Sequence, residues 1–351
     1  MKLFFTLLAS LLLSPVSYAV IQLGEDLTLS GFGSTSITRT DHNVPLFVTR
    51  RIENETCFDC DTIFGLQLDY QPSDNLRFST QVVKRPLDEW SRPELEWLYA
   101  SYEFNQFELH AGRQRLPLFL ASEYYYVGHA YVWARPPQDV YEALLGYTYY
   151  DGVSIDWNVE ITDELVATVT PFYGIGTETE LDFNKYQIEI KSDYSIGLAL
   201  DFAGYNYRIH SAVMHTEFER TFSLFRSTRK QTLTLYTLGA DYQWDNWRIM
   251  AEVESDNMQT AWDTTLAYTM GDWTPYITYG EAHQRRRGQN TIAGVRYYIA
   301  PQISLNAEYQ YVTGSDESYQ AFHEAYFLYA PKFEGEPKDA HVYTFMINFT
   351  F

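Results

Sequence analysis

Apolar side chains recur at every second position through most of this chain. Residues 64–70 read Phe-Gly-Leu-Gln-Leu-Asp-Tyr, and the alternation recurs at 76–82, 205–213, 247–253, 303–311 and 343–351. Successive side chains of a β-strand point to opposite faces, so this period predicts strands with one apolar and one polar face. After residue 19 no run of 18 apolar residues occurs, which excludes a helical membrane span.

Short and long connections alternate along the chain. Seven short ones are expected at 71–75, 105–106, 162–164, 203–204, 243–246, 271–272 and 300–302. Eight long ones are expected at 41–60, 84–93, 116–146, 175–193, 216–230, 255–260, 282–290 and 313–340. This count predicts sixteen strands with both mature termini on the side of the short turns. An even strand number with short turns on one side is typical of an outer-membrane β-barrel.

A soluble pair of β-sandwiches is the alternative architecture. It would require a linker between two domains, and no segment of the chain reads as one. Aromatic residues flank the short turns, as expected for rings at a membrane interface: Tyr70, Phe104, Phe107, Phe202, Tyr205, Tyr242, Trp244, Trp247 and Trp273. The sequence therefore favours an all-β fold, a transmembrane antiparallel barrel closed on itself, because lipid tolerates no unpaired strand edge.

The first nineteen residues predict a signal peptide. Lys2 precedes an apolar stretch at 3–13, and Ser17-Tyr18-Ala19 offers small residues to a signal peptidase. Cleavage after Ala19 leaves residues 20–351 as the outer-membrane β-barrel channel. The formal net charge of −21 excludes a nucleic-acid partner, because no basic face is available to neutralise phosphates.

The last strand carries the most specific local pattern. Tyr343, Phe345, Ile347, Phe349 and Phe351 share one face, and the chain ends at Phe351. In this respect the sequence resembles the general bacterial porins of Gram-negative outer membranes. The resemblance implies a sixteen-stranded homotrimer, a long third loop folded into the lumen, and a terminal phenylalanine that serves as the assembly signal for the barrel-assembly machinery.

Side chains between the lipid-facing positions are expected to line the lumen. Charges of both signs cannot form a dry core, and sixteen strands enclose enough space for water. The predicted pore wall therefore comprises Arg77, Gln81, Glu108, His110, Asp156, Arg208, Asp241, Arg248, Glu252, Glu254, Arg296 and Glu308. The acidic balance predicts a weak cation preference, unless most of the negative charge lies on outer loops.

The third long connection is rich in aromatic and arginine residues. If it folds inward, the pore constriction is expected to place Arg113, Arg115 and Arg135 opposite Glu123, Asp139 and Glu142. Tyr124, Tyr125 and Tyr126 could contact solutes there, since aromatic rings stack on sugar faces. In the alternative interpretation these tyrosines pack the loop against the wall or a neighbouring subunit, and Arg135 merely pairs with a carboxylate.

Other motifs point to structure more than to chemistry. Cys57 and Cys60 predict a small loop-closing disulfide in an exported chain, and too few neighbouring ligands are present to favour a metal there. Arg285–Arg287 could bridge lipopolysaccharide phosphates or a neighbouring barrel, or form a solvated turn. No catalytic constellation, cofactor motif or metal motif is recognisable, so an enzyme is not expected.

The leading functional hypothesis is a porin, a passive diffusion channel for small hydrophilic solutes and ions. Its expected partners are outer-membrane lipid, lipopolysaccharide and the assembly machinery. The first alternative is a substrate-specific channel that uses the aromatic and arginine residues of the third loop. The second is an outer-membrane adhesin or enzyme barrel.

Overall fold

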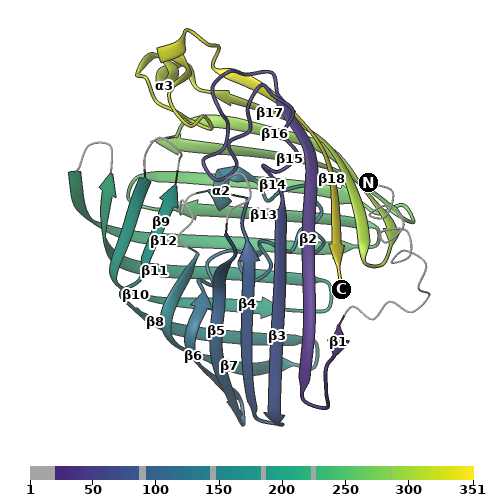
Figure 1. Cartoon of the computed structure of the whole chain (residues 1–351). Helices are drawn as coiled ribbons and strands as arrows, with labels where there is room; N and C mark the ends of the chain where they lie inside the picture. The colour runs from purple at the N-terminus through teal and green to yellow at the C-terminus, as the bar shows by residue number, and fades with distance from the viewer. Residues whose placement is uncertain (1–19, 87–91, 143–147, 183–186, 223–226, 285) are drawn as a thin grey trace.

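The computed structural model describes residues 20–86, 92–142, 148–182, 187–222, 227–284 and 286–351. The predicted signal peptide therefore lies outside the described residues. The described chain is almost entirely β-structure (Figure 1).

Sixteen long strands make up the wall within the described residues. They are β2 (Leu27–Thr40), β3 (Ile63–Ser73), β4 (Leu76–Lys84), β5 (Glu94–Phe104), β6 (Phe107–Arg115), β7 (Tyr149–Thr162), β8 (Leu165–Ile175), β10 (Gln187–Ala203), β11 (Tyr207–Phe222), β12 (Ser227–Trp244), β13 (Trp247–Ser255), β14 (Gln259–Tyr268), β15 (Trp273–Gln284), β16 (Gly288–Ala300), β17 (Ile303–Gly314) and β18 (Asp339–Thr350).

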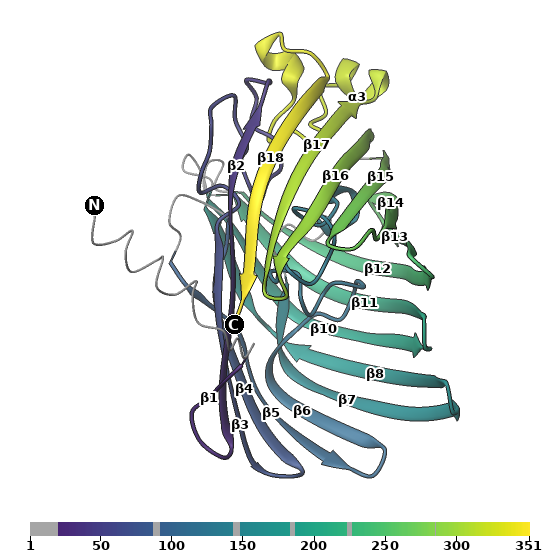
Figure 2. The same ribbon diagram turned by 90° about the vertical axis from the view of Figure 1, so that its right-hand side faces the viewer.

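Every neighbouring pair in this wall is antiparallel, and the wall closes between β18 and β2. Val342 lies opposite Thr40 at one end of that seam, and Thr350 lies opposite Phe32 at the other. The two strands run side by side in Figure 2. The short β1 (Ile21–Gln22) pairs with the start of β2, and β9 (Glu178–Asp182) extends the wall beyond β8 by pairing with β10. The predicted closed barrel of sixteen strands is confirmed.

All seven predicted short turns join consecutive strands. Several predicted long connections are shorter than expected, because the strands continue through them. β10 begins at Gln187, β11 runs to Phe222, and β15 runs to Gln284. Residues such as Glu217 and Glu219 read as loop because they are polar. Strand segments that project beyond a bilayer can be polar on both faces, so periodicity alone underestimates their length.

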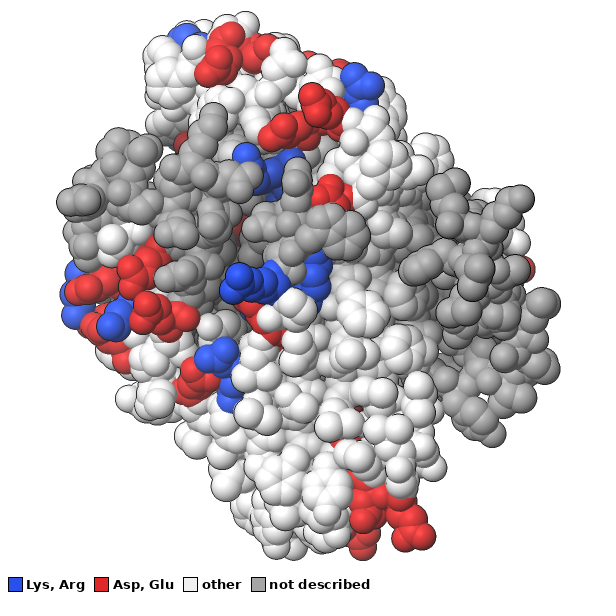
Figure 3. Space-filling view, viewed as in Figure 1, with Lys and Arg blue, Asp and Glu red and all other residues white. Residues whose placement is uncertain are grey.

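The two faces of the wall differ in polarity as the alternation predicts. On β17, Leu305 and Tyr309 are more than a third exposed, whereas Asn306 and Glu308 between them are buried. On β18, Tyr343 and Phe345 are more than half exposed on the same outer face. Figure 3 shows a broad area almost free of charged side chains below the centre of the view, while charged side chains lie at the top, at the left edge and across the middle. An uncharged outer surface suits the hydrocarbon of a membrane.

Helical structure is limited to short pieces in the described residues. They are α2 (Gln138–Tyr141), α3 (Asp316–Gln320) and the 3-10 turn η1 (Pro331–Glu334). None of the described helices is long and apolar enough to cross a membrane. In Figure 2, α3 lies at the end of the barrel opposite β1.

Candidate functional site

Three arginine–aspartate pairs line the polar face of the wall near the short turns. Arg77 on β4 pairs with Asp69 on β3, with 2.8 Å between Nη2 and Oδ1. The same arrangement joins Arg208 to Asp201 at 2.7 Å and Arg248 to Asp241 at 2.5 Å. In each pair the aspartate precedes the turn and the arginine follows it. The arginine side chains are each at least a third exposed on this face.

Arg296 was also predicted to line the pore wall but has a different role. Its side chain is fully buried, and it donates to the backbone oxygens of Gly128 at 2.6 Å and Trp133 at 3.1 Å. A third donation, at 3.1 Å, goes to the side-chain oxygen of Asn306. Arg296 therefore holds the chain that follows β6 against the wall instead of facing open solvent.

The segment 116–142 contacts the polar face of the wall across many strands. Trp133 Nε1 lies 2.9 Å from Thr265 Oγ1 on β14 and 3.0 Å from Thr278 Oγ1 on β15. The amide of Leu120 donates to Glu252 on β13 at 2.8 Å, and the amide of Ala134 donates to Glu308 on β17 at 2.9 Å. Two predicted pore-wall carboxylates, Glu252 and Glu308, thus accept hydrogen bonds from this segment.

Apolar contacts reinforce those hydrogen bonds. Leu118 is fully buried in a cluster with Met214 on β11 and Leu235 on β12, whose apolar side chains lie on the inner face of the wall. Burying a leucine or methionine side chain contributes about 1.5–3 kcal/mol. The fit is close, because a Cβ on Gly280 of β15 would lie 2.6 Å from Asp139 Oδ2.

Asp139 and Glu142, expected at the constriction, are both buried. Tyr326 donates its hydroxyl to Asp139 at 2.5 Å, and Asn290 donates at 2.7 Å. Burial raises the pKa of Asp139 to about 6. Glu142 accepts a hydrogen bond from Thr49 at 3.0 Å, and burial also raises its pKa. Neither carboxyl therefore faces an open passage.

Arg135 is fully buried in a network with the first long loop. Asp61 Oδ1 lies 3.4 Å from Arg135 Nε and 3.1 Å from Arg50 Nη1, and its Oδ2 accepts from Ser36 and Thr38 at 2.9 Å each. Burial alone would raise the pKa of Asp61, but the two arginines hold it below its ordinary value. Sequence reasoning left open that Arg135 pairs with a carboxylate, but it missed Asp61 and Arg50. The apolar run at 44–48 within a long loop was the available signal that this loop packs inward.

The structure corrects the placement of Arg113. Its cross-strand partner is Leu98, which is 53% exposed on the outer face, and Leu109 on the same face of β6 is also exposed. Arg113 forms a two-point ion pair with Asp151, at 2.8 and 2.9 Å, and lies over the Tyr149 ring. Because neighbours two apart on a strand share a face, Arg113 belongs to the outer surface.

Arg115 ends β6 and turns its guanidinium inward. It pairs with the buried Glu96, which also accepts from Arg85 at 2.8 Å, and it lies 5.0 Å above the Tyr126 ring. Tyr126 is buried beside Phe32, Ile63 and Val83, as the wall-packing alternative expects.

The other two tyrosines of the triplet also pack. Tyr125 stacks on Tyr141 with 5.8 Å between ring centroids, and Tyr124 lies against the cluster around Trp133. Burial raises the pKa values of both tyrosines. All three therefore take part in packing the 116–142 segment.

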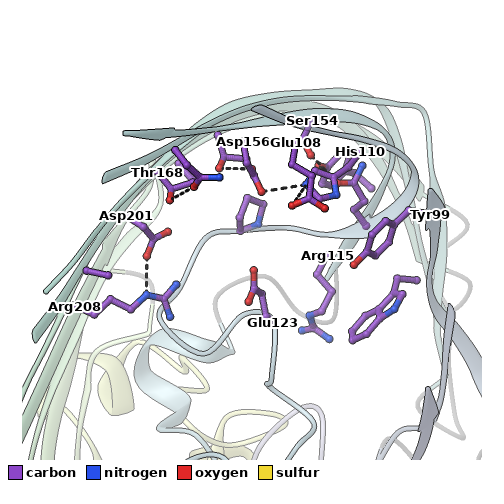
Figure 4. Close-up of a pocket in the computed structure, with 18 of the residues that line it drawn as sticks. Tyr99, Glu108, His110, Arg115, Glu123, Ser154, Asp156, Thr168, Asp201 and Arg208 are labelled. Carbon is purple, nitrogen blue, oxygen red and sulfur yellow. Dashed lines mark hydrogen bonds and ion pairs between the residues drawn. The ribbon is translucent and has the colours of Figure 1, made fainter. Parts of the chain in front are cut away.

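An open cavity of about 600 Å³ remains beside this packed segment. It runs along the polar faces of β5–β8, β10 and β11. Figure 4 shows Glu123 reaching into it from the side opposite the wall, with Arg115 between Glu123 and Tyr99. The acidic, basic and histidine side chains that line the cavity are Glu108, His110, Arg115, Glu123, Asp156, Asp201 and Arg208. Of the expected constriction charges, the cavity brings together Arg115 and Glu123.

The remaining predicted residues have structural partners. Gln81 donates to Gln67 on the inner face at 3.2 Å, and the buried Glu254 accepts from Gln259 at 2.8 Å. Cys57 and Cys60 form a disulfide as predicted. Phe351 exchanges two backbone hydrogen bonds of 2.8 Å with Gly31. Its ring lies over Gly31, where a Cβ would come within 2.3 Å.

Comparison with known proteins supports the barrel interpretation. A family profile described as Gram-negative porin matches residues 171–317. No curated protein matches the sequence significantly.

Solved structures share the fold at low sequence identity. An anion-selective porin from Comamonas acidovorans has a TM-score of 0.62 at 12% identity, covering 93% of this chain and 99% of that one. Salmonella typhi OmpF, in complex with daunomycin, has a TM-score of 0.60 at 11% identity, with 95% and 100% coverage. The trimer form of Vibrio cholerae OmpT has a TM-score of 0.56 at 13% identity, with 93% and 99% coverage. These structures confirm the predicted barrel fold. The profile match supports the predicted resemblance to Gram-negative porins and the predicted outer-membrane location.

Proposed function

We propose that this outer-membrane porin conducts small hydrophilic solutes and ions past the cavity beside β5–β11. One observation carries the proposal: seven acidic, basic or histidine side chains from the wall and from the 116–142 segment face a single cavity of about 600 Å³. Charged groups at such a density need water around them. In this interpretation the 116–142 segment and the first loop fill the opposite side of the lumen and set the width of the passage.

The passage is proposed to favour cations weakly. Four carboxylates line the cavity (Glu108, Glu123, Asp156 and Asp201), against the guanidinium groups of Arg115 and Arg208. A cleft that is lined mostly by one sign of charge concentrates ions of the opposite sign. The chain is similar in fold to a porin described as anion-selective, so the sign of selectivity has to come from the lining residues of this chain.

A salt gradient across a planar bilayer tests both points. The purified mature chain should produce discrete conductance steps, with a reversal potential of the sign expected for cation preference. Glu123→Gln should shift the reversal potential toward zero, because it removes a charge that no strand holds in an ion pair within the described structure. Glu53→Gln is the matched control, because the Glu53 side chain is about half exposed on the first loop and does not line the cavity. An anion-type reversal potential in the unaltered protein would refute the cation preference.

A substrate-specific channel is the second candidate. The observation in its favour is the guanidinium of Arg115 above Tyr126, with Glu123 lining the same cavity. Aromatic and charged groups placed together can bind a solute with both a flat face and a charge. Such a channel should show block of the ion current by micromolar concentrations of a particular solute. A general porin should show no block at these concentrations by any small sugar or amino acid.

We further propose that the chain is made with a signal peptide that is removed after Ala19, and that it assembles as a homotrimer in lipid and lipopolysaccharide. The trimer form of the structurally similar Vibrio cholerae OmpT and the broad apolar outer face support the trimer. Cross-linking of the unheated protein in detergent should give a species of three chains. A single chain at every cross-linker concentration would contradict it.

A further inference from the structure

Three potential metal ligands meet on the cavity wall. Glu108 and His110 lie on β6, and Asp156 lies on β7. His110 Nε2 is 3.1 Å from Asp156 Oδ2 and 3.9 Å from Glu108 Oε2, and one donor atom from each residue lies within 4.8 Å of the other two. Figure 4 shows the three side chains grouped at the edge of the cavity, with Glu123 on its other side.

Strand geometry explains why these side chains converge. Glu108 and His110 are two residues apart, so they share the inner face of β6. Asp156 is the direct cross-strand partner of Glu108, and opposite residues in an antiparallel pair have Cβ atoms about 4.5–5.5 Å apart. Thr170 on β8 donates to Asp156 Oδ1 at 2.6 Å, which leaves Oδ2 turned toward His110. The register of β6 against β7 therefore creates the group.

The donor set suits a first-row transition metal. Imidazole favours ions such as zinc, nickel and copper over magnesium and calcium, and two carboxylate oxygens complete three ligands with open positions for water. Metal–ligand distances of about 2.0–2.2 Å place bound donors about 3–4 Å apart. The three donor atoms are already close to that spacing, so small side-chain rotations bring them onto one ion.

A second histidine–aspartate pair in the barrel shows what distinguishes this group. His210 Nδ1 lies 2.9 Å from Asp201 Oδ2, but the third member of that group is Arg208, whose guanidinium pairs with Asp201. A fixed positive charge repels a cation from that pair. At Glu108, His110 and Asp156 the third member is a carboxylate, and Glu123 lines the same cavity, so the local charge attracts a cation.

We propose that Glu108, His110 and Asp156 form a binding site for a divalent transition-metal ion such as Zn²⁺ on the wall of the cavity. The ion would bind from the water of the cavity, with solvent completing its coordination. In a conducting barrel it would also neutralise part of the carboxylate lining and reduce the cation current. This second consequence rests on the proposed channel function, whereas binding itself does not.

Calorimetric titration of the full mature chain in detergent, purified without a histidine tag, tests the site. ZnCl₂ should bind with one ion per chain, and MgCl₂ in excess should not compete. His110→Gln and Asp156→Asn should each weaken Zn²⁺ binding at least about tenfold, since even outer-shell changes at metal sites cost that much. His215→Gln is the matched control, because His215 lies on the opposite face of the wall and bonds to Thr234.

The outcomes separate the site from its effect on conduction. No Zn²⁺ binding, binding unchanged in both ligand variants, or displacement by Mg²⁺ would overturn the proposal. A difference in gel mobility between unheated and heated samples should show that each variant still forms the barrel. In planar bilayers, Zn²⁺ should reduce the cation current of the unaltered protein reversibly with EDTA, and it should have at least about tenfold less potency on His110→Gln. Binding without any conductance would refute the channel and leave the metal site standing.

Discussion

Removing the charge of Asp61 should loosen the packing inside the barrel without opening its wall. Asp61 lies between Arg50 and Arg135, which belong to two different segments, and all three side chains are at most 3% exposed. Asp61→Asn keeps the shape of the side chain but removes the carboxylate that the two buried guanidinium groups share. Breaking a buried ion pair in this way costs about 3–5 kcal/mol.

That cost should affect the segments more than the strands. The seam between β2 and β18 is held by backbone pairing from Thr40 to Phe32, and Asp61 takes no part in it. We therefore expect Asp61→Asn to fold, but with the first loop and the 116–142 segment less firmly attached. The open-channel current should become larger or noisier, and protease should cut within 41–62 faster than in the unaltered protein.

Single-channel recording and limited proteolysis in detergent measure these effects. Glu53→Gln is the control, since Glu53 lies in the same loop and is about half exposed. Its ion pair with Arg51 is long, at 3.9 Å. The lowered pKa of Asp61 means that its contribution is present above an ordinary pKa of about 3.9 and is lost only as pH falls below that value. Unchanged current and unchanged cleavage in Asp61→Asn would refute the reasoning that this network holds the two segments.

Three further perturbations have defined outcomes. Because the pKa of Asp139 is raised to about 6, its folded state favours the protonated form, and stability should fall as pH rises through about 6. The thermal unfolding midpoint should therefore be lower at pH 8 than at pH 5, and Asp139→Asn should reduce this difference. An equally large difference in the variant would count against this role of Asp139. Gly280→Ala should displace α2 at a cost of about 1–3 kcal/mol, measured by thermal unfolding, whereas Gly24→Ala, with open space around it, should change nothing. Deleting Phe351 should lower the amount of heat-modifiable barrel in the outer membrane, and an equal yield would remove the terminal residue as an assembly signal.

The wall of the barrel could be predicted from the sequence because a strand imposes a simple period. Leu305, Tyr309 and Phe345 face outward, and Asn306 and Glu308 face inward, in the positions that alternation gives. The seven short turns were predictable for the same reason. The strand ends on the side away from these turns could not be predicted. There β11 continues through polar residues such as Glu217 and Glu219, which do not follow the alternation.

The interior could be predicted only in part. The sequence placed Glu108, His110 and Asp156 on the inner face but gave no distance between them, because β6 and β7 are joined by the long third connection and no short turn sets their register. It assigned Arg113 to the constriction from its neighbours in sequence, whereas the strand parity of β6 carries it outward. The pairing of Asp61 with Arg135 spans 74 residues. Contacts between two irregular segments leave no periodic signal.

The proposed conduction requires water in the space that the wall and the 116–142 segment leave open. Conductance of the purified mature chain in a planar bilayer tests this most directly. We expect stepwise currents whose size rises in proportion to the conductivity of the KCl solution, because ions would cross in a water-filled path. A correctly folded, membrane-inserted barrel that produces no steps at any salt concentration would contradict the account.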